Sequence, residues 1–331
     1  MIISKTPYRI SFFGGGTDFP EWFTKNSGAV LSTTIDKYCY LSCRCLPPFF
    51  PHKHRFVYSR VEDIVNIEDI QHPCLKHVFK WLNITNGLEI HHDGDLPARA
   101  GLGSSSSFTV GLLNVMNAYQ NSMSSKKQLA ESAIFVEREL IKESGGWQDQ
   151  VAVSFGGFNF ITFNQNETFE VAPVILKKDT SVALQSHLLL FFTGIQRSAS
   201  KLERKKLSSM EKQEELYHAT YELVDDALSA IVSPEPKIND FGKLMHEGWR
   251  LKKKVGPGVS TRLVDEAYEV AQSKGALGGK LLGAGGGGFL LIFAEPSFHE
   301  QIITALSKFT HVPFNFEYEG SKIALYQPHG L

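Results

Sequence analysis

The sequence predicts an α+β protein with two domains. The chain has 331 residues, which is about twice the length of an average domain. Hydrophobic residues make up 42% and charged residues 21% of the chain, a composition typical of globular proteins. Segments typical of strands are mixed with helical patterns and do not alternate strictly as β-α-β units. We expect a boundary near residues 180–187, and assign residues 1–183 to the first domain and 184–331 to the second.

The first domain opens with segments that are typical of β-strands. Residues 2–13 form the first, and Pro7 interrupts it. Residues 29–46 form one or two further strands, because they are rich in β-branched and aromatic side chains. Residues 88–95 add a short strand that ends in a turn. The sequence therefore predicts a sheet built mainly from the first hundred residues.

Two helices follow a glycine and serine loop at residues 97–107. The first has apolar residues at steps of three and four, namely Phe108, Leu112, Val115, Met116 and Tyr119. The second extends over residues 125–142, and Glu137 falls within its apolar stripe. A carboxylate on a buried face is costly unless it is paired or bound to a metal. Glu137 is therefore a candidate for one of these two roles.

The rest of the chain mixes both kinds of element. We predict strands over 151–163, 187–194 and 289–294, and two short strands near the end of the chain. We predict helices within the polar stretch 196–254, over 257–275 with Gly275 as the stop signal, and over 296–308.

Charge and cysteine content exclude several classes of protein. The net charge is -1, so the chain has no overall field that would attract nucleic acid or an anionic membrane. We expect no signal peptide, because residues 1–10 lack a long apolar core, and no membrane-spanning segment, because no apolar stretch approaches 18 residues. The four cysteines have no metal-binding or C-x-x-C spacing, and three of them share one strand face. We expect a cytoplasmic protein with reduced cysteines; a homo-oligomer is compatible with the sequence, which carries no signal for it.

Residues 97–107 (PARAGLGSSSS) have the composition of a phosphate-binding loop. Glycines let backbone N–H groups approach an anion, and the helix that begins here adds unpaired N–H groups and a positive dipole end. Serine hydroxyls can bind magnesium or phosphate oxygens. No Walker A sequence occurs in the chain. A flexible linker that caps the helix is the alternative interpretation of this loop.

Residues 283–288 (GAGGGG) form a second glycine run, which satisfies the G-x-G-x-x-G pattern of dinucleotide-binding folds. That pattern needs a helix directly after it, whereas residues 289–294 have the character of a strand. The segment that remains is also too short for a nucleotide-binding half. We therefore reject a dehydrogenase, and expect a tight turn that brings backbone close to another group.

Residues 144–150 (SGGWQDQ) place Asp149 shortly after two glycines. Together with TPYRISFFGGGTDFPEW, LPARAGLGSSSS and GGKLLGAGGGGFLL in this order, the motif resembles the GHMP kinase superfamily of ATP-dependent kinases. The matches extend from Thr6 to Phe289. Within the superfamily, the motifs most resemble the bacterial D-glycero-D-manno-heptose 7-phosphate kinases. The resemblance implies an N-terminal mixed α/β domain, a ferredoxin-like C-terminal domain, and an active site in the cleft between them.

The resemblance also implies roles for individual residues. Asp149 and Arg9 would be catalytic, with Asp149 beside the acceptor hydroxyl and Arg9 next to it. Ser105 and Glu137 would bind Mg²⁺. The ATP-binding loop would comprise Gly101, Leu102, Gly103, Ser104, Ser105 and Ser106, and the substrate would contact Gly14, Gly15, Gly16, Thr17, Asp18, Gly146, Gly285 and Gly286.

One departure from the sugar-kinase pattern concerns the acceptor. Gly14–Gly16 stand where other members have acidic and histidine side chains, which leaves room for a different or larger sugar. The resemblance implies phosphorylation of the anomeric hydroxyl of heptose 7-phosphate, and Arg197 and the Lys252–Lys254 run are candidates for its phosphate. Alternatives are a galactose-, fucose- or mannose-type sugar kinase, a diphosphomevalonate-type decarboxylase, and a sugar-sensing protein without catalysis.

Overall fold

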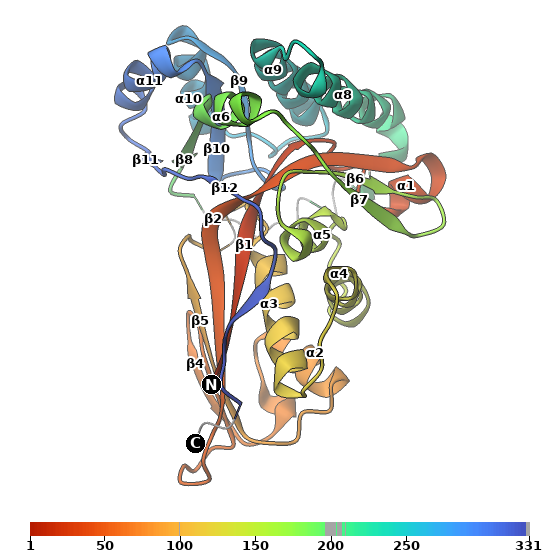
Figure 1. Cartoon of the computed structure of the whole chain (residues 1–331), viewed down its shortest axis with the longest axis vertical. Coiled ribbons are helices and arrows are strands. Elements are labelled where there is room, and N and C mark those ends of the chain that lie inside the picture. Colours follow the sequence, from red (N-terminus) through yellow and green to blue (C-terminus); the bar gives the residue numbers. More distant parts are fainter. Residues whose placement is uncertain (99, 196–202, 204–206, 209, 329–331) are drawn as a thin grey trace.

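The computed structural model describes residues 1–98, 100–195, 203, 207–208 and 210–328. These residues form a nine-stranded sheet and a four-stranded sheet, each covered by helices (Figure 1). The predicted α+β class and two-domain arrangement are confirmed.

The larger sheet is built around two long antiparallel strands. Its main path has the order β13-β1-β2-β5-β3-β4, and β6, β7 and β12 extend it beside β2. Pro7 shifts the register of β1 against β2 but does not interrupt the strand as the sequence suggested. The strands are β1 (Ile2–Phe13), β2 (Gly28–Cys45), β3 (His54–Val57), β4 (Val61–Ile64), β5 (Leu88–Gly94), β6 (Asn159–Phe163), β7 (Phe169–Pro173), β12 (Phe316–Glu317) and β13 (Lys322–Tyr326).

Helices α2 to α5 lie on one side of this sheet (Figure 1). Helix α3 lies directly against β1 and β2 and is buried along most of its length, as its predicted apolar face requires. The helices are α1 (Pro20–Asn26), α2 (Pro73–Trp81), α3 (Ser104–Tyr119), α4 (Lys126–Phe135) and α5 (Gln148–Phe155). Helix α4 continues into a π-helical turn, Val136–Leu140, which holds Glu137. Such turns occur frequently at functional sites.

The prediction of one strand over residues 151–163 is wrong in its first part. Residues 151–155 belong to α5, and only Asn159–Phe163 forms strand β6. Gly156 and Gly157 have positive φ angles and separate the two elements. Both halves of this apolar run are largely buried, one as a helix and one as a strand. Composition alone therefore did not distinguish a short buried helix from a buried strand.

The smaller sheet has the order β11-β8-β10-β9, and all neighbouring strands are antiparallel. In chain order this is the β-α-β-β-α-β arrangement of ferredoxin-like domains, as expected. Its elements, with the helix that precedes it, are α6 (Lys178–Ser186), β8 (Leu188–Phe192), α8 (Glu214–Val232), α9 (Ile238–Lys254), α10 (Arg262–Ser273), β9 (Ala276–Leu281), β10 (Phe289–Ala294), α11 (His299–Ala305) and β11 (Thr310–His311).

The two domains share a continuous apolar core. Phe241 of α9 packs edge-on against Phe12 and Phe13 at the end of β1, with ring centroids 5.6 and 5.0 Å apart. The smaller sheet begins at Leu188, close to the boundary placed after residue 183. The chain then returns to the larger sheet, where β12 pairs with β2 and β13 with β1. Residues 316–326 therefore lie in the first sheet, which the assignment of 184–331 to one domain did not anticipate.

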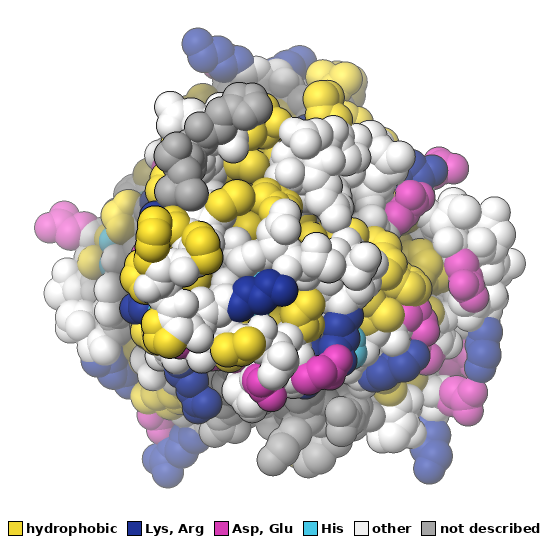
Figure 2. Space-filling model, turned by 90° about the horizontal axis from the view of Figure 1, so that it is seen from below, with side chains coloured by type: hydrophobic (Ala, Val, Ile, Leu, Met, Phe, Trp, Pro, Cys, Tyr) yellow, Lys and Arg dark blue, Asp and Glu magenta, His cyan; other side chains and the backbone are white. Residues whose placement is uncertain are grey.

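The lower end of the molecule carries several exposed apolar side chains. Figure 2 views this end from below and shows hydrophobic side chains among charged ones. Phe49, Phe50, Val61 and Val65, in or next to the β3–β4 hairpin, are exposed. Of the helices that the structure describes, none is long and apolar enough to cross a membrane.

Candidate active site

Arg9, which is buried, and Asp149, which is partly exposed, form an ion pair between β1 and the first turn of α5. Arg9 Nε and Nη2 donate to the two carboxylate oxygens of Asp149, both at 2.7 Å. Arg9 Nη1 donates to the Gly101 carbonyl at 2.8 Å, and the Arg9 backbone N–H donates to the Leu102 carbonyl. A two-point contact of this kind fixes the carboxylate in orientation as well as position. The two predicted catalytic residues are thus brought together against the glycine and serine loop.

The glycine and serine loop leads directly into α3. Gly103 precedes the helix in the left-handed conformation, and a glycine has no side chain to cap the first-turn N–H groups. A Cβ atom on Gly103 would lie 3.4 Å from Asp149 Oδ2. Ser104 is half-buried and Ser105 is exposed at the start of the helix, whereas Ser106 is buried. The start of α3 can therefore hold an anion next to Asp149.

The backbone of the second glycine run, residues 283–288, packs directly against the backbone of the glycine and serine loop. A Cβ on Gly283 would lie 2.4 Å from the Cα of Gly101, and the Phe289 N–H donates to the Ala100 carbonyl at 3.1 Å. Lys252 Nζ donates to the carbonyls of Leu281 and Gly283 at 2.7 and 2.6 Å. The second domain therefore meets the predicted ATP loop through main-chain contacts.

Gly285 and Gly286 of the same run lie against the segment around Val259. The Gly286 N–H donates to the Val259 carbonyl at 3.0 Å, and a Cβ on Gly285 would lie 2.6 Å from that oxygen. Contact of these two glycines with a substrate stays a prediction.

Gly283→Ala is expected to loosen the contact between the two glycine runs. Gly283 has a φ of 70°, a conformation that costs an L-residue about 1–2 kcal/mol, and the new methyl group would meet backbone. We expect a lower melting temperature and a raised KM for ATP, measured by thermal unfolding and ATP titration. Gly256→Ala is the control, because a Cβ there meets no atom within 4 Å. Identical behaviour of the two variants would contradict the proposed contact.

Asp18 joins the turn at residues 14–18 to the loop that carries Asp149. Its carboxylate accepts hydrogen bonds from the backbone N–H groups of Gly16 at 2.8 Å and Gln148 at 3.1 Å. Gly146 lies so close that a Cβ there would be 2.0 Å from Asp18 Oδ2. Burial raises the pKa of Asp18 to about 6, and the nearby charge of Asp149 adds to this effect. The structure gives Asp18 a positioning role, while direct contact with a sugar stays a prediction.

Thr17 stabilises the turn at residues 14–18 from its buried side. Its hydroxyl donates to the carbonyls of Gly14 at 2.8 Å and Ala29 at 2.9 Å. The side chain is completely buried. Thr17, which the resemblance placed among the substrate contacts, therefore anchors the turn, and its contact with a substrate stays a prediction. Gly15 is the exposed residue of this turn.

Glu137 is buried beneath the start of α3 and keeps one oxygen without a partner. Its Oε2 accepts hydrogen bonds from Ser106 Oγ, at 3.1 Å, and from Gln150 Nε2. Its Oε1 has no hydrogen-bond partner within the described part of the chain. Burial, followed by the charge of Glu143, raises the pKa of Glu137 to about 8. An unsatisfied buried carboxylate oxygen fits a cation-binding role.

Ser106, the neighbour of the predicted metal ligand Ser105, contacts Glu137 directly. Ser105 was predicted to share a metal with Glu137, but Ser106 is the serine whose hydroxyl reaches this carboxylate. One residue along a helix turns a side chain by about 100°, so neighbouring serines face different directions. Among the described residues, no group of three or more His, Cys, Asp or Glu side chains could hold a metal. A metal here would need serine and phosphate oxygens beside Glu137.

Sequence reasoning missed two supporting residues, Gln150 and Arg138, and did not foresee the contacts of a third, Lys252. Gln150, which contacts Glu137, belongs to the SGGWQDQ motif, but its helical position was not predicted. Arg138 donates to the Gly145 carbonyl at 2.9 Å and pairs with Glu21, so it supports the loop before Asp149. Lys252 was a candidate for a substrate phosphate; its Nζ donates to the carbonyls of Leu281 in β9 and Gly283 in the second glycine run, and contact with a phosphate stays a prediction. Arg197, the other candidate, lies outside the described residues.

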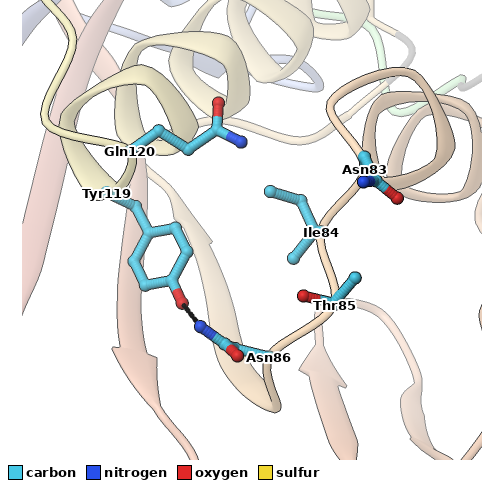
Figure 3. A pocket seen from close by; sticks show the side chains of 6 residues that line it. All are labelled: Asn83, Ile84, Thr85, Asn86, Tyr119 and Gln120. Carbon is cyan, nitrogen blue, oxygen red and sulfur yellow. Dashed lines mark hydrogen bonds between the residues drawn. The ribbon is translucent and has the colours of Figure 1, made fainter.

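A shallow surface hollow lies away from these residues. It is lined by Asn83, Ile84, Thr85, Asn86, Tyr119 and Gln120. Figure 3 shows the Asn86 side chain donating to the Tyr119 hydroxyl, at 2.9 Å, across one side of it. None of the predicted site residues lines this hollow, so it is not part of the candidate active site.

Comparisons with known proteins cover nearly the whole chain. Residues 70–157 match the GHMP kinases N terminal domain, and residues 227–311 match the GHMP kinases C terminal family. The chain is 31% identical to the D-glycero-alpha-D-manno-heptose 7-phosphate kinase of Campylobacter jejuni, covering 97% of this chain and 98% of the relative. It is 28% identical to the galactokinase of Pyrococcus furiosus over 89% of each chain.

Solved structures show the same fold. A D-glycero-D-manno-heptose 1-phosphate kinase from Bacteroides thetaiotaomicron superposes with a TM-score of 0.79 at 24% identity, covering 99% of this chain and all of that one. Lactococcus lactis galactokinase in complex with galactose gives a TM-score of 0.72 at 20% identity, covering 97% and 94% of the two chains. The two-domain arrangement is therefore shared with sugar kinases of different acceptors.

Proposed function

The chain belongs to the GHMP kinases and is an ATP-dependent sugar kinase, and from this premise we propose that its acceptor is D-glycero-D-manno-heptose 7-phosphate. The product is then the 1,7-bisphosphate, on the route to nucleotide-activated heptose for surface polysaccharide. The observation that carries this assignment is the similarity to the Campylobacter jejuni enzyme over nearly the full length of both chains. The use of ATP and the four free cysteines support a cytoplasmic location.

The arrangement around Asp149 supports direct phosphoryl transfer between two bound substrates. Transfer of this kind depends mainly on positioning and on neutralising charge. The N-terminus of α3 would bind the ATP phosphates through backbone N–H groups. Gly103 keeps the gap between this loop and Asp149 free of a side chain, since a Cβ atom there would lie 3.4 Å from Asp149 Oδ2. A sugar hydroxyl beside Asp149 would thus face the terminal phosphate of ATP.

Asp149 is placed to accept the proton of the attacking hydroxyl. Arg9 donates to both carboxylate oxygens, so it fixes the direction of the Asp149 side chain. Glu137 and a serine of the α3 start, Ser106 or Ser105, would hold Mg²⁺, with Glu137 Oε1 as the available oxygen. The metal would neutralise charge on the phosphate oxygens.

A panel of acceptors tests the proposed function. ADP release is followed in a coupled assay with heptose 7-phosphate, galactose, fucose and mannose, and carbon dioxide is measured in parallel. We expect kcat/KM for heptose 7-phosphate to exceed that for each unphosphorylated hexose at least about tenfold, equivalent to about 1.4 kcal/mol. Equal or faster turnover of galactose or fucose would contradict the acceptor. Release of carbon dioxide would point to decarboxylation instead.

A further inference from the structure

The π-helical turn after α4 sends two consecutive side chains to different parts of the candidate active site. Glu137 is directed at the start of α3, where its Oε2 accepts a hydrogen bond from Ser106 Oγ at 3.1 Å. Arg138, the next residue, reaches the loop before Asp149, and its Nη1 donates to the Gly145 carbonyl at 2.9 Å. One turn therefore contacts both the predicted metal side and the predicted base side of the site.

The loop between this turn and α5 has no regular secondary structure. Residues 142–146 form neither helix nor strand. Among the described residues, a Cβ on Gly145 would meet no atom within 4 Å, so close packing does not fix the chain at this point. The loop is tied at its far end, where the Trp147 N–H donates to the Asp18 carbonyl at 3.0 Å. Arg138 therefore holds the stretch that precedes this tie.

Arg138 has a second partner, which lies on α1. Its Nη2 donates to Glu21 Oε1 at 2.7 Å. Glu21 belongs to the first turn of α1, the helix that follows the turn at residues 14–18. The Arg138 side chain is only 16% exposed, and a guanidinium presents its N–H groups in a planar fork, which suits two acceptors at once. Arg138 thus joins the π-helical turn to both chain segments that surround Asp18.

We propose that Arg138 is a positioning residue, which sets the place of Asp149 relative to the metal side of the site. Glu137 and Arg138 share one turn, so a fixed Gly145 carbonyl keeps the loop that leads to Asp149 at a constant distance from Glu137. Phosphoryl transfer depends on such alignment, and a misplacement of about 1 Å can cost about 10² in rate. The inference rests on the roles proposed for Asp149 and Glu137, and not on the identity of the sugar.

Arg138→Met is expected to lower kcat by about tenfold to 10² in single-turnover measurements, with whichever sugar the enzyme turns over fastest. Methionine has no N–H group to donate to Gly145 or Glu21. The KM for ATP and the Mg²⁺ concentration for half-maximal rate should stay unchanged, because the start of α3 and Glu137 keep their own contacts. Arg138→Lys should restore part of the rate, since an ammonium group can reach one acceptor but lacks the fork.

The decisive measurement repeats Arg138→Met in an enzyme that already carries Asp149→Asn. If Arg138 acts through Asp149, the second substitution should add little further loss once the base is removed. A general folding effect would lower the rate by the same factor in both enzymes. Equal factors, or a normal rate for Arg138→Met alone, overturn the proposal. A normal rate for Asp149→Asn would overturn it together with the base, whereas the panel of acceptors decides the sugar separately.

Glu139→Gln is the matched control on the same turn. Glu139 pairs with Lys142 at 3.1 Å, and the two side chains are 60% and 72% exposed. This variant loses an ion pair of the turn but keeps the contact between Arg138 and Gly145, so its kcat should be normal. Thermal unfolding shows whether each variant is folded at the assay temperature, and Arg138→Lys carries the test if Arg138→Met is not. An equal loss for Glu139→Gln would assign the effect to the turn as a whole and overturn the proposal.

Discussion

Asp149→Asn is expected to lower kcat by about 10² to 10⁴, the contribution typical of a positioned general base. Asparagine keeps the shape of the side chain but cannot accept the proton of the sugar hydroxyl. It also replaces one of the two oxygens that Arg9 holds at 2.7 Å with an amide group that donates. The loss should appear in single-turnover measurements, which report the chemical step directly.

Two controls separate this effect from a folding defect. The affinity for ATP should change little. The melting temperature should fall, because the Arg9 side chain is only 4% exposed and loses its charged partner, so thermal unfolding must show that the variant is folded at the assay temperature. Arg9→Met should also lower kcat, since it leaves the Asp149 carboxylate without its two-point contact. A single-turnover loss of less than about threefold for Asp149→Asn, far below the range expected of a base, would remove Asp149 from the mechanism.

Glu137→Gln is expected to raise the Mg²⁺ concentration needed for half-maximal rate by about 10- to 100-fold, the range known for weakened metal sites. Glutamine keeps the hydrogen bonds to Ser106 and Gln150 within reach but removes the negative charge. The variant should fold normally, which thermal unfolding without Mg²⁺ would verify. An unchanged Mg²⁺ titration would exclude Glu137 as a ligand.

Alanine variants of the two serines decide which one takes part. If Ser106 is the ligand, Ser106→Ala should shift the Mg²⁺ titration and Ser105→Ala should not. The contact between Ser106 and Glu137 favours this result. The reverse result would support the assignment made from the sequence motif.

The elements predicted most accurately are those with a local signal. Helix α3 begins at Ser104, within the glycine and serine loop placed at residues 97–107, and its apolar face follows the predicted spacing. Strand β10 follows the second glycine run, as predicted. This expectation of a strand in place of a helix was the reason to reject a dinucleotide-binding fold. The pairing of Arg9 with Asp149, 140 residues apart, came from the family resemblance, because no pattern in a single sequence reports such a contact.

The features that sequence reasoning missed depend on long-range packing. Residues 151–155 are apolar enough for a buried strand, and only their position against α3 and α4 makes them a helix. The return of β13 to the edge of β1 leaves no local signal in a five-residue strand. The approach of Gly283 to Gly101 joins two loops that looked independent. The burial of Ser106 beside Glu137 depends on where α3 begins, because the start of the helix sets which serine faces inward.

The position of the transferred phosphate in the product tests the central claim most directly. The enzyme is incubated with ATP, Mg²⁺ and heptose 7-phosphate, and the product is examined by ³¹P NMR with coupling to sugar protons. We expect a new phosphate resonance coupled to the anomeric proton, formed in a one-to-one ratio with ADP. ADP formed without this resonance, or a phosphate coupled to any other sugar proton, would contradict the account of an anomeric sugar kinase.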